Sequence, residues 1–90
     1  MQKALVSVTG VDRPGIIAAV STALFEININ VLEISQTILD GYFTMLMIVD
    51  ITSATVPFSD TAKKLSEVGE KLGEVISIQR TDLFDAMHRI

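Results

Sequence analysis

Apolar residues recur at two different spacings along this chain, and the order in which the spacings follow one another leaves few possible folds. Four segments have the two-residue period of a strand with a buried face: residues 3–9, 30–39, 42–51 and 75–81. Apolar residues three or four positions apart predict two helices, one that ends near Ile27 and one from Ser59 to Gly73. The expected order is therefore strand, helix, strand, strand, helix, strand.

Residue types that favour turns and helix ends lie between these segments. Pro14 suits the first turn of the first helix, where a missing N–H costs nothing, and Asn28 can end that helix in a left-handed conformation. Asp40-Gly41 is the favoured two-residue hairpin turn. Ser59 is the expected N-cap of the second helix, and Gly73 ends it.

The periodicity also predicts which side chains face the core. The expected inward residues are Ala4, Val6, Val8, Ile17, Val20, Leu24, Ile27, Leu32, Ile34, Ile38, Phe43, Met45, Met47, Val49, Ile51, Ala62, Leu65, Val68, Gly69 and Leu72. Strand 42–51 also carries Leu46 and Ile48 on its other face, which suits a central strand.

Two strand–helix–strand units that share a hairpin predict an α+β fold of the ferredoxin-like type. In this βαββαβ sandwich, a four-stranded antiparallel sheet carries two helices on one face. Asp82 is expected to begin a short C-terminal tail helix. The chain has 90 residues without an internal linker or repeat, so residues 1–90 are expected to form a single domain.

Charge and composition argue against several classes of function. The net charge of -4 argues against binding to nucleic acid or to an anionic membrane, because both usually require a basic patch. The absence of cysteine excludes disulfides, thiolate metal sites and the Cys pair of a copper chaperone. No apolar run reaches the roughly 18 residues of a membrane span, and the start lacks the features of a signal peptide, so we expect a cytoplasmic protein. We expect no cofactor and no metal, with His88 solvated.

Catalysis and RNA binding find little support among the residues. No Ser-His-Asp set can be assembled around the single histidine, and the Gly-rich phosphate loop of acylphosphatases, which share this fold, is missing. RNA-recognition domains have the same order of elements but need a basic face and exposed aromatic residues on the middle strands. Only Tyr42 and Phe43 qualify here. We therefore predict a binding module without catalytic residues.

The segment TGVDRPGII, residues 9–17, joins the first strand to the first helix. A helix start has unpaired N–H groups and a partial positive charge, which suit a carboxylate or phosphate. Gly15 lets a ligand approach the backbone closely, and Asp12 is placed to hold an ammonium group. A second interpretation remains open, in which Asp12 only caps the helix and Pro14 only starts it.

The same segment resembles the ACT domain, a small ligand-sensing module found in amino-acid metabolism. The resemblance rests on Asp12-Arg13-Pro14-Gly15 after the first strand and on Asn30-Val31 at the start of the second. Residues 34–45, ISQTILDGYFTM, and the C-terminal LFDAMHRI are similar to the free-standing UPF0237 type, which is also similar to the ACT domains of glycine-cleavage regulators.

The resemblance implies a regulatory module that binds an amino acid or similar small metabolite at a dimer interface and modulates a partner protein, which the sequence does not identify. The ligand-binding residues that it implies are Asp12, Arg13, Pro14, Gly15, Ile16 and Asn30. Some amino-acid-binding ACT domains carry a histidine where this chain has Gly10. Two interpretations remain for Asn30: contact with ligand across a two-chain interface, or a place in the helix-to-strand turn. The alternative function is a structural protein–protein interaction module without a small-molecule ligand.

The second strand is expected to lie at an edge of the sheet, where an unpaired strand invites pairing with another chain. Residues 31–38 contain one charge, Glu33, and no proline. Side-by-side pairing of two copies of this strand joins two sheets into one, so we expect a homodimer. The alternative is a monomer whose edge is covered by its own tail helix.

Overall fold

The structure is a computed structural model, and it describes residues 1–82. Its elements follow the predicted order: β1 (Lys3–Val11), α1 (Ile16–Glu26), β2 (Asn30–Leu39), β3 (Tyr42–Asp50), α2 (Phe58–Leu72) and β4 (Glu74–Arg80). The tail helix expected to begin at Asp82 lies outside the described residues. Within residues 1–82, neither helix has the length and apolar character needed to cross a membrane.

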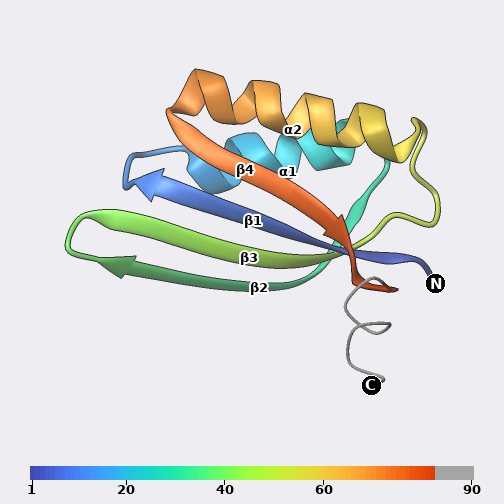
Figure 1. The fold of residues 1–90 in the computed structure, drawn as a ribbon, viewed down its shortest axis with the longest axis horizontal. Helices are drawn as coiled ribbons and strands as arrows, with labels where there is room; N and C mark the ends of the chain where they lie inside the picture. Colours follow the sequence, from blue (N-terminus) through green and yellow to red (C-terminus); the bar gives the residue numbers. More distant parts are fainter. Residues whose placement is uncertain (83–90) are drawn as a thin grey trace.

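The strands form one antiparallel sheet in the order β2-β3-β1-β4, and both helices cover the same face of it (Figure 1). This is the predicted ferredoxin-like sandwich, with β3 and β1 in the centre and β2 at an edge. Asp40 and Gly41 have φ angles of 53° and 79°, as the predicted two-residue hairpin turn between β2 and β3 requires.

The core lies between the two helices and the inner faces of β1 and β3. Every predicted inward residue of these two strands is buried, and Leu24 of α1 and Leu65 of α2 close the core from above with no exposed surface. Thr61 of α2 is also buried, and its hydroxyl donates to the carbonyl oxygen of Pro57 at 3.3 Å. The dense packing of these side chains fixes both helices on the sheet.

Both helices begin at a different residue from the one predicted. Gly15, not Pro14, sits at the start of α1, and no side chain caps the helix, so Asp12 does not act as a cap. As a result Ile16 faces the core, and Ile17 is 37% exposed. Pro57, with an extended backbone, is the N-cap of α2, and Ser59 lies inside the first turn, so the predicted N-cap at Ser59 was wrong.

Leu32 was predicted to share the inward face of β2 with Ile34 and Ile38. A β-bulge near the start of the strand interrupts this alternation at Leu32. Val31 pairs with Val49 of β3, but Glu33 pairs with the next residue, Ile48, so Leu32 is an extra residue without a partner. After the bulge, Ile34 and Ile38 lie on the helix-covered side of the sheet. They are still 48% and 57% exposed, because the two helices do not extend over the edge strand.

Gly69 sets the distance between α2 and β4. It is buried, and a Cβ built on it would lie 2.6 Å from the carbonyl oxygen of Glu74 at the start of β4. Gly73 ends the helix with φ 72°, so β4 begins one residue later. Only a residue without a side chain lets the helix approach the strand this closely.

We therefore expect Gly69→Ala to destabilise the fold by about 1–3 kcal/mol, because the added methyl group forces α2 away from β4. In an ordinary helix interior the same change would stabilise by about 1 kcal/mol. Urea unfolding measures the difference, with Ser66→Ala on the exposed face of α2 as the control. A stabilised Gly69→Ala variant would show that the contact with Glu74 is not tight.

A carboxylate stabilises the turn that follows β3. The Thr52 N–H donates to Asp50 Oδ1 at 2.9 Å, and Thr52 Oγ1 accepts from the Gln2 N–H at 2.8 Å. The hydroxyl of Thr52, and then its N–H, lower the pKa of Asp50 below the usual 3.8 because both favour the charged carboxylate.

Replacing Thr52 by alanine should raise the pKa of Asp50 toward its usual value, whereas Thr52→Ser, which keeps the hydroxyl, should leave it low. The stabilisation from this contact is complete above the pKa of Asp50 in the unfolded chain. It is lost as the pH falls through the lower pKa of the folded chain. NMR titration of the Asp50 carboxyl carbon measures both variants, and identical titration curves for them would contradict the role of the hydroxyl.

Candidate functional site

The loop between β1 and α1 carries most of the predicted site residues. Asp12, Arg13, Pro14 and Gly15 are all exposed, and Ile16 is buried where the helix begins. The N–H of Asp12 donates to the carbonyl oxygen of Gly41 at 2.9 Å. The loop is therefore tied to the β2–β3 hairpin turn, and its position follows from that of the sheet.

The first turn of α1 has backbone donors without acceptors. The first helical hydrogen bond runs from the N–H of Ala19 to the carbonyl oxygen of Gly15 at 3.0 Å. The N–H groups of Ile16, Ile17 and Ala18 precede that bond, and no side chain caps them among the described residues. These three N–H groups, which we call the helix tip, carry the partial positive charge of a helix start.

The space around Gly15, in front of the helix tip, is open. Its φ of 85° is in the left-handed region, which strongly favours glycine. A Cβ built at Gly15 would meet nothing within 4 Å. The backbone conformation, and not a lack of space, therefore requires glycine here, and a ligand has room to approach the donors.

A groove of about 650 Å³ lies beside the helix tip, between α1 and the uncovered part of β2. It is lined by Asp12, Arg13, Gly15, Ile16, Ile17, Ala18, Ser21, Gln36, Ile38 and Phe43. Four of the six predicted ligand-binding residues thus meet at one place. Pro14 belongs to the same loop, but it is not part of the lining.

Asn30, the sixth predicted residue, lies at the other end of the sheet. It pairs with Asp50, which also faces Lys3 at the start of β1, whereas the loop follows Val11 at the end of β1. Lys3 and Val11 are eight residue steps apart along β1, about 26 Å of strand. Within one chain, the structure does not bring Asn30 to the loop.

Arg13 reaches toward the end of α2. A Cβ built on Gly73 would lie 3.2 Å from an Arg13 guanidinium nitrogen, so the guanidinium covers the last residue before β4. Carbonyl groups at a helix end carry a partial negative charge, which favours a cation there. Among residues 1–82, Arg13 forms no ion pair within 4.0 Å.

The sequence analysis missed one charged residue, Glu74. It is only 6% exposed, and neither of its carboxylate oxygens has a hydrogen-bond partner within the described chain. Because Glu74 precedes Ile76 and Ile78 by two and four residues, the alternation of β4 already placed it on the inward face. The expected strand began one residue too late, at Val75, so this signal was overlooked.

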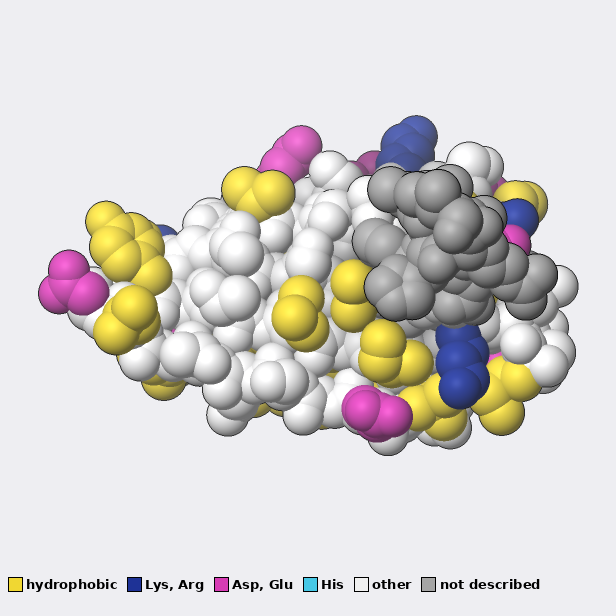
Figure 2. All heavy atoms as spheres, turned by 60° about the horizontal axis from the view of Figure 1, so that its bottom comes forward, with side chains coloured by type: hydrophobic (Ala, Val, Ile, Leu, Met, Phe, Trp, Pro, Cys, Tyr) yellow, Lys and Arg dark blue, Asp and Glu magenta, His cyan; other side chains and the backbone are white. Residues whose placement is uncertain are grey.

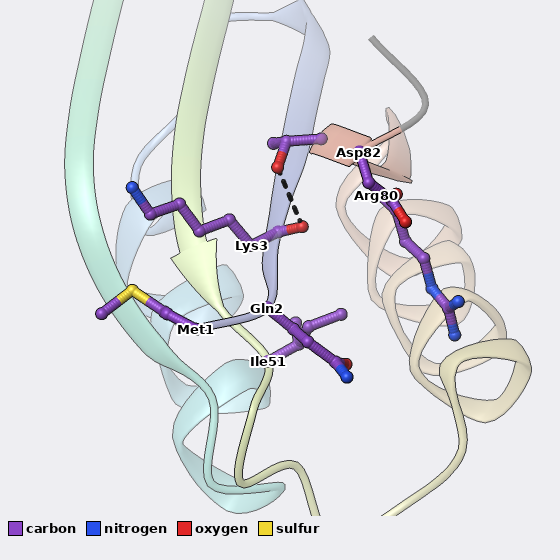
Figure 3. A pocket seen from close by; sticks show the side chains of 7 residues that line it. Met1, Gln2, Lys3, Ile51, Arg80 and Asp82 are labelled. Atoms are coloured by element: carbon purple, nitrogen blue, oxygen red, sulfur yellow. Dashed lines mark hydrogen bonds between the residues drawn. The ribbon is translucent and has the colours of Figure 1, made fainter. Parts of the chain in front are cut away.

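The rest of the described surface has fewer features of a binding site. A hollow of about 390 Å³ at the opposite end of the sheet includes Lys3, Arg80 and Thr81, whose hydroxyl donates to the Lys3 carbonyl oxygen at 3.3 Å (Figure 3). Figure 2 shows separate hydrophobic side chains on the sheet face away from the helices, with a few acidic and basic side chains among them. Within residues 1–82, no three His, Cys, Asp or Glu side chains come together as metal ligands would.

Comparison with known proteins shows the family of the chain. The sequence model of the ACT domain family matches residues 2–79. A UPF0237 protein from Methanocaldococcus jannaschii is 49% identical over 90 residues, which are 100% of each chain. Among solved structures, an ACT domain protein from Streptococcus pneumoniae superposes with a TM-score of 0.82 at 36% identity, over 92% of this chain and 93% of that one.

A more distant solved relative is the regulatory subunit of aspartate kinase from Thermus thermophilus. Its TM-score is 0.66 at 25% identity, over 87% of this chain and 50% of that one. The family match covers most of the chain, and the UPF0237 relatives cover all of it. The predicted resemblance is confirmed, and the chain belongs to the ACT domain family, among the UPF0237 proteins.

Proposed function

We propose that this chain is a non-catalytic regulatory module that binds an amino acid or similar small metabolite in the groove beside α1. In this proposal the module acts in the cytoplasm on a partner protein that remains to be identified. The helix tip is the observation that carries the proposal. Three uncapped N–H groups border a groove large enough for a small ligand, and such groups bind carboxylates well.

The charges of the groove support a zwitterionic ligand. The helix tip attracts the ligand carboxylate, and the negative charge of Asp12 in the groove lining favours a ligand that also carries a positive charge. The apolar side chains of Ile16, Ile38 and Phe43 can contact the rest of the ligand. The solved aspartate kinase relative is a regulatory subunit, which agrees with a regulatory function for this chain.

We expect free amino acids to shift the amide resonances of Gly15, Ile16, Ile17 and Ala18, because the carboxylate accepts hydrogen bonds from the helix tip. Titration of the ¹⁵N-labelled protein with each standard amino acid measures these shifts, and the Val75 amide on β4 serves as an internal reference. A thermal-shift screen extends the search to nucleotides. If no compound moves these amides or stabilises the protein, the chain is better explained as an interaction module without a ligand.

A second copy of the chain would complete the groove. The edge of β2 is unpaired in this structure, and Ile34 and Ile38 beside it are about half exposed. If two β2 strands pair antiparallel about a two-fold axis, the start of one lies beside the end of the other. The partner's Asn30 then lies near Ile38 and the groove, which gives Asn30 a place in the site that one chain alone does not.

We therefore expect the wild-type protein to be a dimer and Ile34→Lys to be a monomer, because lysine on an edge strand blocks strand addition. Val75→Lys on the other edge strand, β4, makes the same chemical change at a position that is 72% exposed, and it should remain dimeric. Sedimentation equilibrium distinguishes these states. A monomeric wild-type protein would remove the partner's Asn30 from the site.

A further inference from the structure

The burial of Glu74 needs an explanation. Its side chain is withdrawn from water, and both carboxylate oxygens are without a hydrogen-bond donor in the described chain. An unpaired buried charge is strongly unfavourable, and native proteins rarely keep such a group without a use for it. Apolar residues occupy the equivalent inward positions of β4 at Ile76 and Ile78, so the fold itself does not demand an acid.

The packing around Glu74 places its carboxylate at the base of the β1–α1 loop. Glu74 pairs with Gly10 of β1, and a Cβ built on Gly10 would lie 2.5 to 2.6 Å from all three carboxylate atoms. The acid thus fills the space that a side chain at residue 10 would occupy. Gly10 also pairs with Phe43, which lines the groove beside the helix tip, so Gly10, which has no side chain, lies between the strand position of Glu74 and the groove lining.

The protein brings a cation close to Glu74 without neutralising it. The guanidinium of Arg13 covers Gly73, the residue directly before Glu74, but the two side chains form no ion pair within 4.0 Å. Asp12, which lines the groove, is exposed, so water screens its attraction for a cation. A buried carboxylate attracts a positive charge more strongly than an exposed one does.

We propose that Glu74, and not Asp12, binds the ammonium group of the ligand. This inference rests on the proposed function. It makes the ligand a zwitterion that contacts two elements of the fold, its carboxylate at the helix tip and its amine at the start of β4. Because the oxygens of Glu74 are covered in this structure, the ammonium reaches them when the exposed side chain of Arg13, whose guanidinium lies over the adjacent Gly73, changes its rotamer.

Glu74→Gln tests the inference because it removes the charge and keeps the shape of the side chain. The probes are the standard L-amino acids and, for the one that binds the wild type most tightly, its 2-hydroxy acid, which lacks the amine. We expect the wild type to prefer the amino acid, and we expect Glu74→Gln to bind it about tenfold or more weakly and to lose that preference. Glu67→Gln on the exposed face of α2 is the control for loss of one negative charge.

The thermal stability of a Glu74 variant, measured together with its amino-acid binding, distinguishes a binding role of Glu74 from a merely structural one. Glu74→Leu removes the buried charge, so its melting temperature should rise by about 5 °C while its amino-acid binding is lost. If the wild type binds amino acids and Glu74→Gln binds them equally well, the role of Glu74 is wrong and the proposed function stands. If the wild type binds none of them, both are wrong.

Discussion

The contact between the two helices and the two central strands is the interaction on which the rest of the structure depends. Leu24 of α1 and Leu65 of α2 belong to one buried cluster with the inward side chains of β1 and β3. Two helices are not wide enough to cover four strands, so part of the edge strand β2 stays uncovered. The groove beside α1 is a direct result of this mismatch between the width of the helix layer and the width of the sheet.

Most of the fold could be predicted from the sequence because its signals are local. The hairpin turn at Asp40-Gly41, the left-handed residues Asn28 and Gly73, and the alternation in β1 and β3 each depend on a few neighbouring residues. In α1 the predicted inward residues Val20 and Leu24 are buried, but Ile17 was wrong, because only the packed core selects Ile16 over Ile17 in the first turn. The bulge at Leu32 left no mark on the apolar pattern, because Leu32 is apolar like Ile34, with which it alternates in the sequence.

The candidate site was predicted only in part, and the reason is physical. A short loop motif places Asp12, Arg13, Gly15 and Ile16 together because they are adjacent in sequence. Glu74 comes to the same region from the other end of the chain through its pairing with Gly10, and that pairing is a property of the complete sheet. Asn30 could be assigned to the edge strand, but its distance from the loop depends on the strand register.

The bulge at Leu32 also limits how far another strand can extend this sheet. Regular pairing along the free edge is uninterrupted only over residues 33–39, after the point at which the register shifts. A flat edge of unlimited length would recruit any extended peptide, as the growing ends of amyloid fibrils do. A short edge that ends at a bulge accepts only a partner strand of matching length and curvature. The bulge at Leu32, which the sequence pattern did not reveal, therefore limits uncontrolled assembly.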